Sequence, residues 1–174
     1  MLEPELKELG FLNISLDLED AYLVACIPSN LPEGKTAPSI GFVAPVDTAD
    51  FNAENTQPQV HLNYDGEDVL LNSELGLMMR VEEFPNLKNY IGQTLITTDG
   101  TTLLGADDKA GLVSILEAAI DLLVTPEIPH GDIWVAFGPD EEIGKGAHRF
   151  KAERMPAQFA YTLDSGVVGK LEYE

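Results

Sequence analysis

Residues 109–124 read KAGLVSILEAAIDLLV, and this stretch decides the fold. Its apolar side chains fall on nearly every side of a helix, so the pattern predicts a long helix that is largely buried. Pro126 and Pro129 follow and end the helix, because proline cannot continue it. A long buried helix needs other elements to pack against, and the neighbouring runs provide them.

Short apolar runs on both sides of this helix predict β-strands. We expect strands at residues 11–18, 22–27, 39–46, 94–98, 132–137, 159–163 and 167–173. Strands alternating with one long helix predict an α/β fold, a layered sheet with helices packed on it. Residues 49–90 are polar, contain Pro58 and Pro85, and predict few regular elements.

The composition limits the class of protein. With 174 residues the chain is long enough for one domain with its own core and short for two. Thirty acidic and ten basic residues give a formal net charge of -20, which disfavours nucleic acid as a partner because phosphate binding needs clustered Lys and Arg. Cys26 is the only cysteine, which excludes an intrachain disulfide and a cysteine-rich zinc site.

The sequence shows no membrane or secretory signal. No apolar run approaches the roughly 20 residues of a membrane span. The first residues, MLEPEL, are acidic and lack the basic and then apolar pattern of a signal peptide. We therefore expect a cytoplasmic protein without a membrane partner.

Acidic residues lie at four places where a predicted strand ends or the long helix begins. They are Asp47, Asp107 with Asp108, Glu141 with Glu142, and Asp164. Each can have a purely structural role, since the pair at 107–108 can cap the helix and the others can lie in solvated turns. Ligand clefts form at strand ends in open α/β sheets. Carboxylates gathered there repel one another unless they are exposed, protonated or bound to cations.

Longer motifs around these residues resemble the peptidase T family, the tripeptide aminopeptidases among the cocatalytic zinc exopeptidases. The motifs are GQTLITTDG at 92–100, TLLGADDKAG at 102–111, IPHGD at 128–132 and PDEEIGKGA at 139–147. The likeness continues through YTLD at 161–164 and GKLEYE at 169–174. It implies that residues 1–174 are a partial zinc-exopeptidase catalytic domain. Such a part would lack the start of the domain, the lid or dimerisation domain and the carboxyl-terminal part.

The resemblance implies a role for each acidic position. Asp107 matches the carboxylate that bridges two zinc ions, and Glu142 and Asp164 match a terminal ligand on each ion. Glu141 matches the general base, and Asp47 matches a catalytic aspartate that orients a histidine ligand two residues earlier. The implied reaction is removal of the amino-terminal residue from a tripeptide, with the two metal ions activating water.

The chain departs from the family pattern at the histidine ligands. Pro45 stands where the family has the first one, and the second belongs to a later part of the family sequence. His61, His130 and His148 do not lie where they could replace them. We expect weak metal binding, better suited to hard cations than to zinc, and little or no hydrolysis by this chain alone. The alternative is an inactive relative, an interaction module or split-gene fragment that pairs with a second copy or a partner fragment.

The acidic loops resemble two unrelated kinds of site less closely. VDTA at 46–49 and LDSG at 163–166 look like the paired loops of aspartic proteases, but Ala49 stands where glycine is expected. An aspartic-protease site would also leave the acidic residues at 107 and 141–142 without a role. Residues 138–146 are rich in glycine like a nucleotide-binding loop, but the loop is acidic and Gly146 replaces the required Ser or Thr.

Overall fold

The structure is a computed structural model that describes residues 2–164, 166 and 169–172. Its contacts divide the chain into two compact units. The larger unit comprises Met1–Ala49 with Ala106–Glu174, and the smaller one is Asp50–Gly105. The smaller unit lies within the range 1–174 for which one partial catalytic domain is predicted, and that domain assignment stays a prediction.

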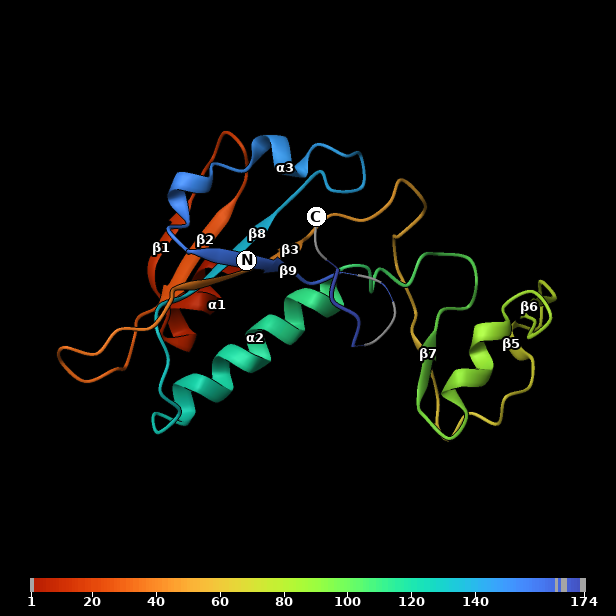
Figure 1. Cartoon of the computed structure of the whole chain (residues 1–174). Helices are drawn as coiled ribbons and strands as arrows, with labels where there is room; N and C mark the ends of the chain where they lie inside the picture. Colours follow the sequence, from red (N-terminus) through yellow and green to blue (C-terminus); the bar gives the residue numbers. More distant parts are fainter. Residues whose placement is uncertain (1, 165, 167–168, 173–174) are drawn as a thin grey trace. The chain divides into compact units, whose positions relative to one another are not determined.

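The larger unit is built on a five-stranded sheet (Figure 1). Its strands are β1 (Leu12–Leu16), β2 (Leu23–Ile27), β3 (Ile40–Pro45), β8 (Ile133–Gly138) and β9 (Phe159–Thr162), in the order β1-β2-β8-β3-β9. β1, β2 and β8 pair antiparallel, whereas β8, β3 and β9 run parallel. All five strands were predicted to within a few residues. A further predicted strand, 167–173, includes residues 167, 168 and 173, which lie outside the described residues.

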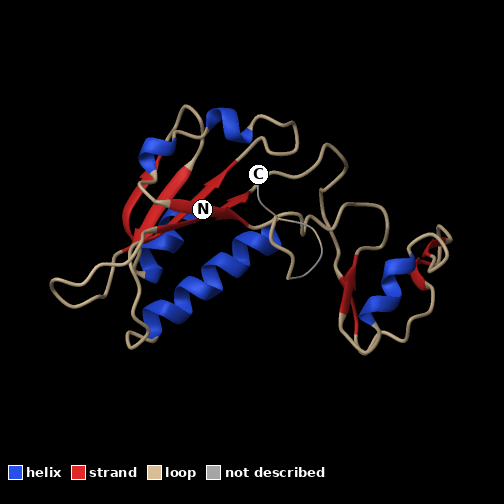
Figure 2. Cartoon of the chain, viewed as in Figure 1, coloured by secondary structure: helices blue, strands red, loops and turns tan. Residues whose placement is uncertain are grey.

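Helical segments lie on both faces of this sheet, which confirms the predicted α/β class (Figure 2). The helical segments of the unit are α1 (Leu2–Leu9), α2 (Lys109–Val124), α3 (Gly146–Arg149) and the 3-10 turn η2 (Ala152–Arg154). α1 and α2 pack on the face that carries Val135 and Phe137 of β8. Trp134 belongs to the opposite face, because successive side chains of a strand alternate, and there Met155, which follows η2, packs against it.

Helix α2 is buried on one side only. Leu112, Ile115, Leu116 and Ala119 are buried, whereas Val113 is 51% exposed. The prediction of a largely buried helix was therefore wrong. α2 forms the outer layer over the sheet, so its apolar residues on the far side stay at the surface of the unit.

The smaller unit, Asp50–Gly105, holds two small sheets and a 3-10 helix. These are β4 (Gln59–His61) with β7 (Leu95–Thr97), β5 (Val69–Asn72) with β6 (Leu77–Met79), and η1 (Pro85–Tyr90). Its core contains Tyr64, Val69 and Leu87. Strands of three or four residues are too short for the alternating pattern to stand out, which is why few elements were predicted here.

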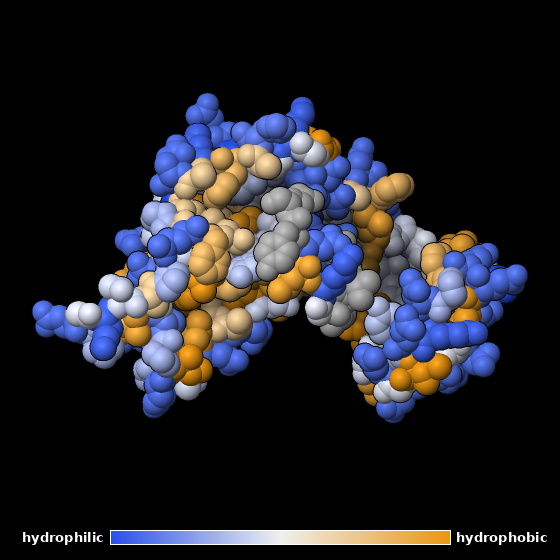
Figure 3. All heavy atoms as spheres, in the orientation of Figure 1, coloured by the Kyte–Doolittle hydropathy of each residue, from blue (hydrophilic) through white to orange (hydrophobic). Residues whose placement is uncertain are grey.

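Hydrophobic side chains are also exposed on the surface, where Figure 3 shows them among hydrophilic residues. In the smaller unit Phe51 is 75% exposed and Leu62 is 72% exposed. Within the described ranges, no helix combines the length and the apolar character that crossing a membrane requires.

Candidate functional site

The predicted site residues follow the carboxyl ends of the parallel strands. Asp47 lies two residues beyond β3, and Asp164 lies two residues beyond β9. Glu141 and Glu142 lie in the turn after β8. Because β8, β3 and β9 are parallel neighbours, their carboxyl ends lie side by side, at the position where ligand sites form in such sheets.

Asp107, Asp108 and Asp164 form the centre of the candidate site. One carboxylate oxygen of each lies within 4.8 Å of the others, and we call this group the aspartate cluster. Two of the predicted metal ligands, Asp107 and Asp164, are thus brought together, and Asp108 joins them. Among the described residues, the group does not include Glu142, the third predicted ligand. Nor does it include Asp47, which an aspartic-protease site would pair with Asp164.

Asp108 is the buried member of the aspartate cluster. It is 5% exposed, whereas Asp107 and Asp164 are exposed. Its Oδ1 accepts a hydrogen bond from the backbone N–H of Gly111 at 3.0 Å, and this bond caps helix α2. Its Oδ2 is buried without a hydrogen-bond partner. A cis peptide bond joins Asp107 to Asp108.

Burial raises the pKa of Asp108 to about 6, because it removes water from the charged form. The hydrogen bond from Gly111 lowers the pKa, while the negative charges of Asp164, Asp107 and Glu141 raise it further. Asp108 therefore carries its charge with little compensation from its surroundings. A bound cation would stabilise that charged form.

Lys109 directly follows Asp107 and Asp108 in sequence, but its ammonium group points to the loop after β3. Its Nζ donates to the backbone oxygen of Asp47 at 3.1 Å and lies 2.9 Å from Oγ1 of Thr48. In the part of the chain that the structure describes, no lysine or arginine forms an ion pair with Asp107 or Asp108. The nearest basic side chain in sequence thus holds the loop after β3 instead.

Asp47 holds the backbone of the acidic turn. Its Oδ1 accepts from the N–H of Glu141 at 3.3 Å, and its Oδ2 accepts from the N–H of Glu142 at 3.2 Å. Pro45, the last residue of β3, offers no side-chain donor. Asp47 therefore has no histidine two residues before it, and its carboxylate holds the backbone of the two glutamates.

The turn after β8 keeps Glu141 close to the aspartate cluster. The N–H of Gly144 donates to the oxygen of Glu141 at 2.8 Å, and the N–H of Gly146 donates to the oxygen of Asp140 at 2.9 Å, which closes the turn. The pKa of Glu141 is raised, first by partial loss of solvent and then by the nearby negative charges, Asp164 foremost. A raised pKa suits a carboxylate that accepts a proton near neutral pH.

The histidines make their hydrogen bonds elsewhere. His61 Nε2 lies 3.0 Å from Thr97 Oγ1 within the smaller unit. His130 Nδ1 donates to the backbone oxygen of Gly131 at 2.7 Å, at the start of β8. Over the described ranges, no histidine belongs to a group of side chains arranged to hold a cation.

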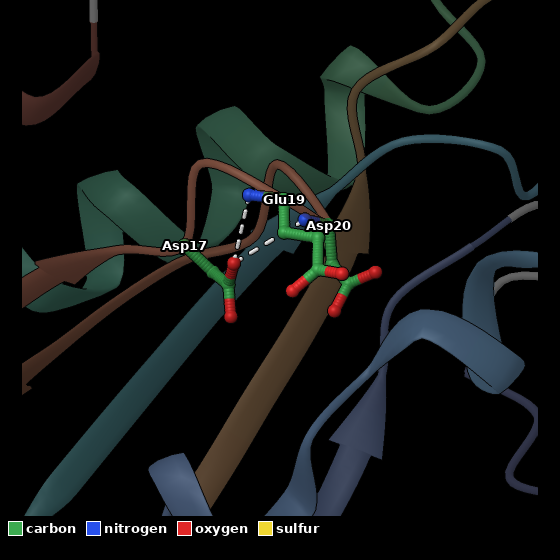
Figure 4. Close-up of side chains that lie close together, drawn as sticks. All are labelled: Asp17, Glu19 and Asp20. Carbon is green, nitrogen blue, oxygen red and sulfur yellow. Dashed lines mark hydrogen bonds between the residues drawn. The ribbon is translucent and has the colours of Figure 1, made fainter.

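A second acidic group lies in the turn between β1 and β2, and we call it the turn cluster (Figure 4). Asp17, Glu19 and Asp20 also bring one oxygen each within 4.8 Å of the others. The N–H groups of Glu19 and Asp20 donate to Asp17 Oδ1 at 2.9 and 3.3 Å. No motif in the sequence points to this group.

Basic side chains neutralise the turn cluster. Lys151 Nζ lies 2.8 Å from Asp17 Oδ2 and 2.7 Å from Asp20 Oδ2. Arg154 Nη1 lies 3.3 Å from Asp17 Oδ2. The Lys151 hydrogen bond, with the backbone N–H groups, lowers the pKa of Asp17 to about 2. The cluster is therefore a set of ion pairs.

Comparison with known proteins finds a family model and full-length peptidases that are similar to this chain. The family model described as Peptidase family M20/M25/M40 matches residues 94–169, the range that contains the aspartate cluster and the acidic turn. Over the whole chain, identity is 56% to a peptidase T of Fusobacterium nucleatum and 53% to a peptidase T of Bacillus licheniformis. The chain spans 42% of the length of these curated relatives.

Solved structures give the same result. The aminopeptidase PepT of Bacillus cereus superposes with a TM-score of 0.65 at 28% identity, over 94% of this chain and 36% of that one. A tripeptidase of Staphylococcus aureus superposes with a TM-score of 0.62 at 28% identity, over 95% of this chain and 38% of that one. The fold is thus that of part of these peptidases.

Proposed function

Because this chain resembles peptidase T along its whole length, we propose that it carries the acidic half of a metal-dependent tripeptide aminopeptidase site. The reaction would remove the amino-terminal residue from a small peptide. The chain spans 42% of its relatives' length, so this activity belongs to a whole enzyme of which such a chain would be part. The observation that carries the proposal is the meeting of Asp107 and Asp164 in one cluster beside Glu141.

The donor set of the aspartate cluster fits a divalent cation. Every donor is a carboxylate oxygen, and Asp108 also has one buried oxygen, Oδ2, without a hydrogen-bond partner. Carboxylates suit hard cations such as Mg²⁺, Ca²⁺ and Mn²⁺, whereas zinc sites usually include nitrogen or sulfur ligands. Two zinc ions are what the resemblance implies, and the residues of this chain fit harder ions better.

We assign the acidic residues the following roles. Asp107 would lie between two cations, with Asp164 and Glu142 as a further ligand on each. Such cations would polarise the scissile carbonyl and activate the attacking water. Glu141, whose pKa is raised, would accept the proton of that water and pass it to the leaving amine. Asp47 would keep Glu141 in place through its backbone N–H.

The charge of the chain supports a cationic ligand. A formal net charge of -20 attracts metal ions and the ammonium group at the amino terminus of a peptide, and repels nucleic acid.

Exposed hydrophobic residues such as Phe51 and Leu62 would be covered by a second copy or a partner fragment. Light scattering would show a mass above that of one chain if such pairing occurs.

The second candidate function is an inactive relative that serves as an interaction module. Pro45 favours it, because a proline at the end of β3 cannot ligate a metal ion. With carboxylates alone, each ion would keep about two ligands from the predicted set, which leaves binding weak. This candidate predicts cation binding without hydrolysis by the isolated chain.

Metal titration and a peptidase assay test these proposals together. We expect the purified chain to bind Mn²⁺, and Asp107→Asn and Asp164→Asn to lose most of that affinity. Unchanged affinity in both variants would show that the metal site is assigned wrongly. Tripeptide cleavage that a chelator abolishes and Asp107→Asn lacks would then favour an active chain. Binding without cleavage would favour the inactive relative, and Pro45→His should raise the Zn²⁺ affinity in either case.

A further inference from the structure

The resemblance to peptidase T assigns no role to Asp108, although it lies within the aspartate cluster. One of its oxygens lies within 4.8 Å of ligand oxygens of Asp107 and Asp164. We propose that Asp108 supplies an oxygen to a cation held by Asp107 and Asp164, so that this chain forms an all-carboxylate site for a hard divalent ion. The inference rests on the proposed metal site and adds a ligand to it.

Helix capping accounts for only half of the Asp108 carboxylate. Oδ1 accepts the N–H of Gly111 at 3.0 Å, which is all that a cap requires. Oδ2 is left buried without a hydrogen-bond donor. An unpaired buried carboxylate oxygen is costly, and buried charges in proteins are normally paired or coordinate metals. A cation in the cluster supplies the partner that the protein does not.

Gly111 keeps the Asp108 carboxylate in this position. A Cβ at residue 111 would lie 2.5 Å from both carboxylate oxygens, closer than real Cβ contacts allow. The absent side chain therefore makes room for the carboxylate above the first turn of α2. Glycine lowers helix stability relative to alanine, so the space that it leaves for the carboxylate accounts for its presence here.

A third carboxylate matches the donor type of Asp107 and Asp164, the other members of the aspartate cluster. Pro45, the last residue of β3, offers no side-chain nitrogen donor. In the described part of the chain, Asp108 is the third member of the group that holds Asp107 and Asp164, and no histidine belongs to that group. Three carboxylates suit hard ions such as Mn²⁺, Mg²⁺ or Ca²⁺, which prefer oxygen ligands, whereas zinc sites usually include nitrogen or sulfur.

Titration with Mn²⁺, followed by electron paramagnetic resonance of the free ion, tests the role of Asp108. Asp108→Asn keeps the cap, since asparagine accepts the Gly111 N–H as well as aspartate does, but it loses the charged donor. We expect its Mn²⁺ affinity to fall by at least about tenfold, the scale typical for altered metal sites. Thermal unfolding without metal should show that the variant remains folded.

Two matched variants separate ligation from charge. Glu141→Gln removes a carboxylate that also acts electrostatically on Asp108 but lies outside the cluster, and should weaken Mn²⁺ binding less than Asp108→Asn. Asp17→Asn removes a charge from the turn cluster and should leave Mn²⁺ binding unchanged.

The outcomes distinguish this inference from the proposed function. If Asp107→Asn abolishes binding while Asp108→Asn stays within the effect of Glu141→Gln, the metal site stands and Asp108 is only a cap. If the unaltered chain binds no Mn²⁺ at millimolar concentration, the all-carboxylate site is refuted along with metal binding by this chain.

Discussion

Two groups of three carboxylates in the larger unit have similar oxygen–oxygen distances but differ in their ion pairs, their burial and the direction of their pKa shifts. In both, one oxygen of each residue lies within 4.8 Å of the others. In the turn cluster, Lys151 supplies the positive charge, and the pKa of Asp17 falls to about 2 (Figure 4). In the aspartate cluster, Asp108 is buried with one oxygen unpaired, and its pKa rises to about 6.

This contrast shows that crowding of acidic groups does not by itself indicate a metal site. Carboxylates that a lysine already neutralises gain little from a cation, because the favourable charge interaction is already made. The buried Oδ2 of Asp108 has no hydrogen-bond partner and has that interaction still to gain. Variants that alter one cluster and leave the other intact can therefore test the difference.

The largest expected effect is stabilisation by metal through the aspartate cluster. Mn²⁺ at 100 times its Kd should raise the free energy of unfolding by about 2.7 kcal/mol, because it binds the folded state only. Asp107→Asn should abolish this increment, and Asp17→Asn should keep it. Urea unfolding with and without Mn²⁺ measures the difference. Equal loss in the two variants would mean that the clusters do not differ as cation sites.

A smaller effect on the free energy of unfolding separates the helix-capping role of Asp108 from its charge. In the metal-free chain, Asp108→Ala should be about 1 kcal/mol less stable than Asp108→Asn, because alanine cannot accept the N–H of Gly111. Urea unfolding in the presence of a chelator gives both values. Lys145 offers a control, since it precedes α3 without a side-chain capping bond and its replacement by alanine should change stability little. Equal stability of the two Asp108 variants would contradict the capping role.

The turn cluster should gain a weak cation site when its lysine is removed. Lys151→Met keeps the apolar stem and takes away the charge that lies 2.8 Å from Asp17 and 2.7 Å from Asp20. A second, weaker equivalent of Mn²⁺ should then bind, limited by Arg154, which still pairs with Asp17. Lys7→Met, which removes an exposed lysine paired with Glu3, should create no such site. Absence of a second equivalent would mean that lysine is not what keeps cations out.

Local patterns account for much of the larger unit. α2 and β8 were predicted because each is an apolar run, and Pro126 marks the end of the helix. The order of the strands, and which of them run parallel, depends on pairings between distant segments that no local pattern encodes. For the same reason the exposed side of α2 was missed. The apolar residues of α2 do not show by themselves whether a second element packs on the side away from the sheet.

The candidate site was predictable only in part. The family motifs single out Asp107 and Asp164, which the structure brings together, while Asp108 reads in sequence as an ordinary cap. Its burial follows from the packing of α2 on the sheet and from Gly111, whose lack of a side chain matters only in three dimensions. The turn cluster was invisible, because its lysine lies 134 positions after Asp17.

The smallest effect is the pH dependence that the turn cluster adds to stability. The pKa of Asp17 is about 2 in the folded chain and near 3.8 without its partners, so the unfolded state binds more protons between these values. The stabilisation from the ion pair should therefore be complete above about pH 5 and should decline as the pH falls toward about 2. The difference in unfolding free energy between the unaltered chain and Asp17→Asn should shrink over the same range.

The Lys151→Met background tests whether the lysine causes this pH dependence. Lys151 is the largest cause of the lowered pKa of Asp17, so Asp17→Asn should alter the acid profile less when residue 151 is methionine. Urea unfolding at several pH values between about 3 and 6 in low salt measures the four variants, because salt screens such exposed pairs. A pH profile that Lys151→Met leaves unchanged would show that Lys151 does not cause the low pKa, and would leave Arg154 and the backbone N–H groups of Glu19 and Asp20 as its cause. The contrast between the two groups would then depend less on Lys151 and more on the buried, unpaired oxygen of Asp108.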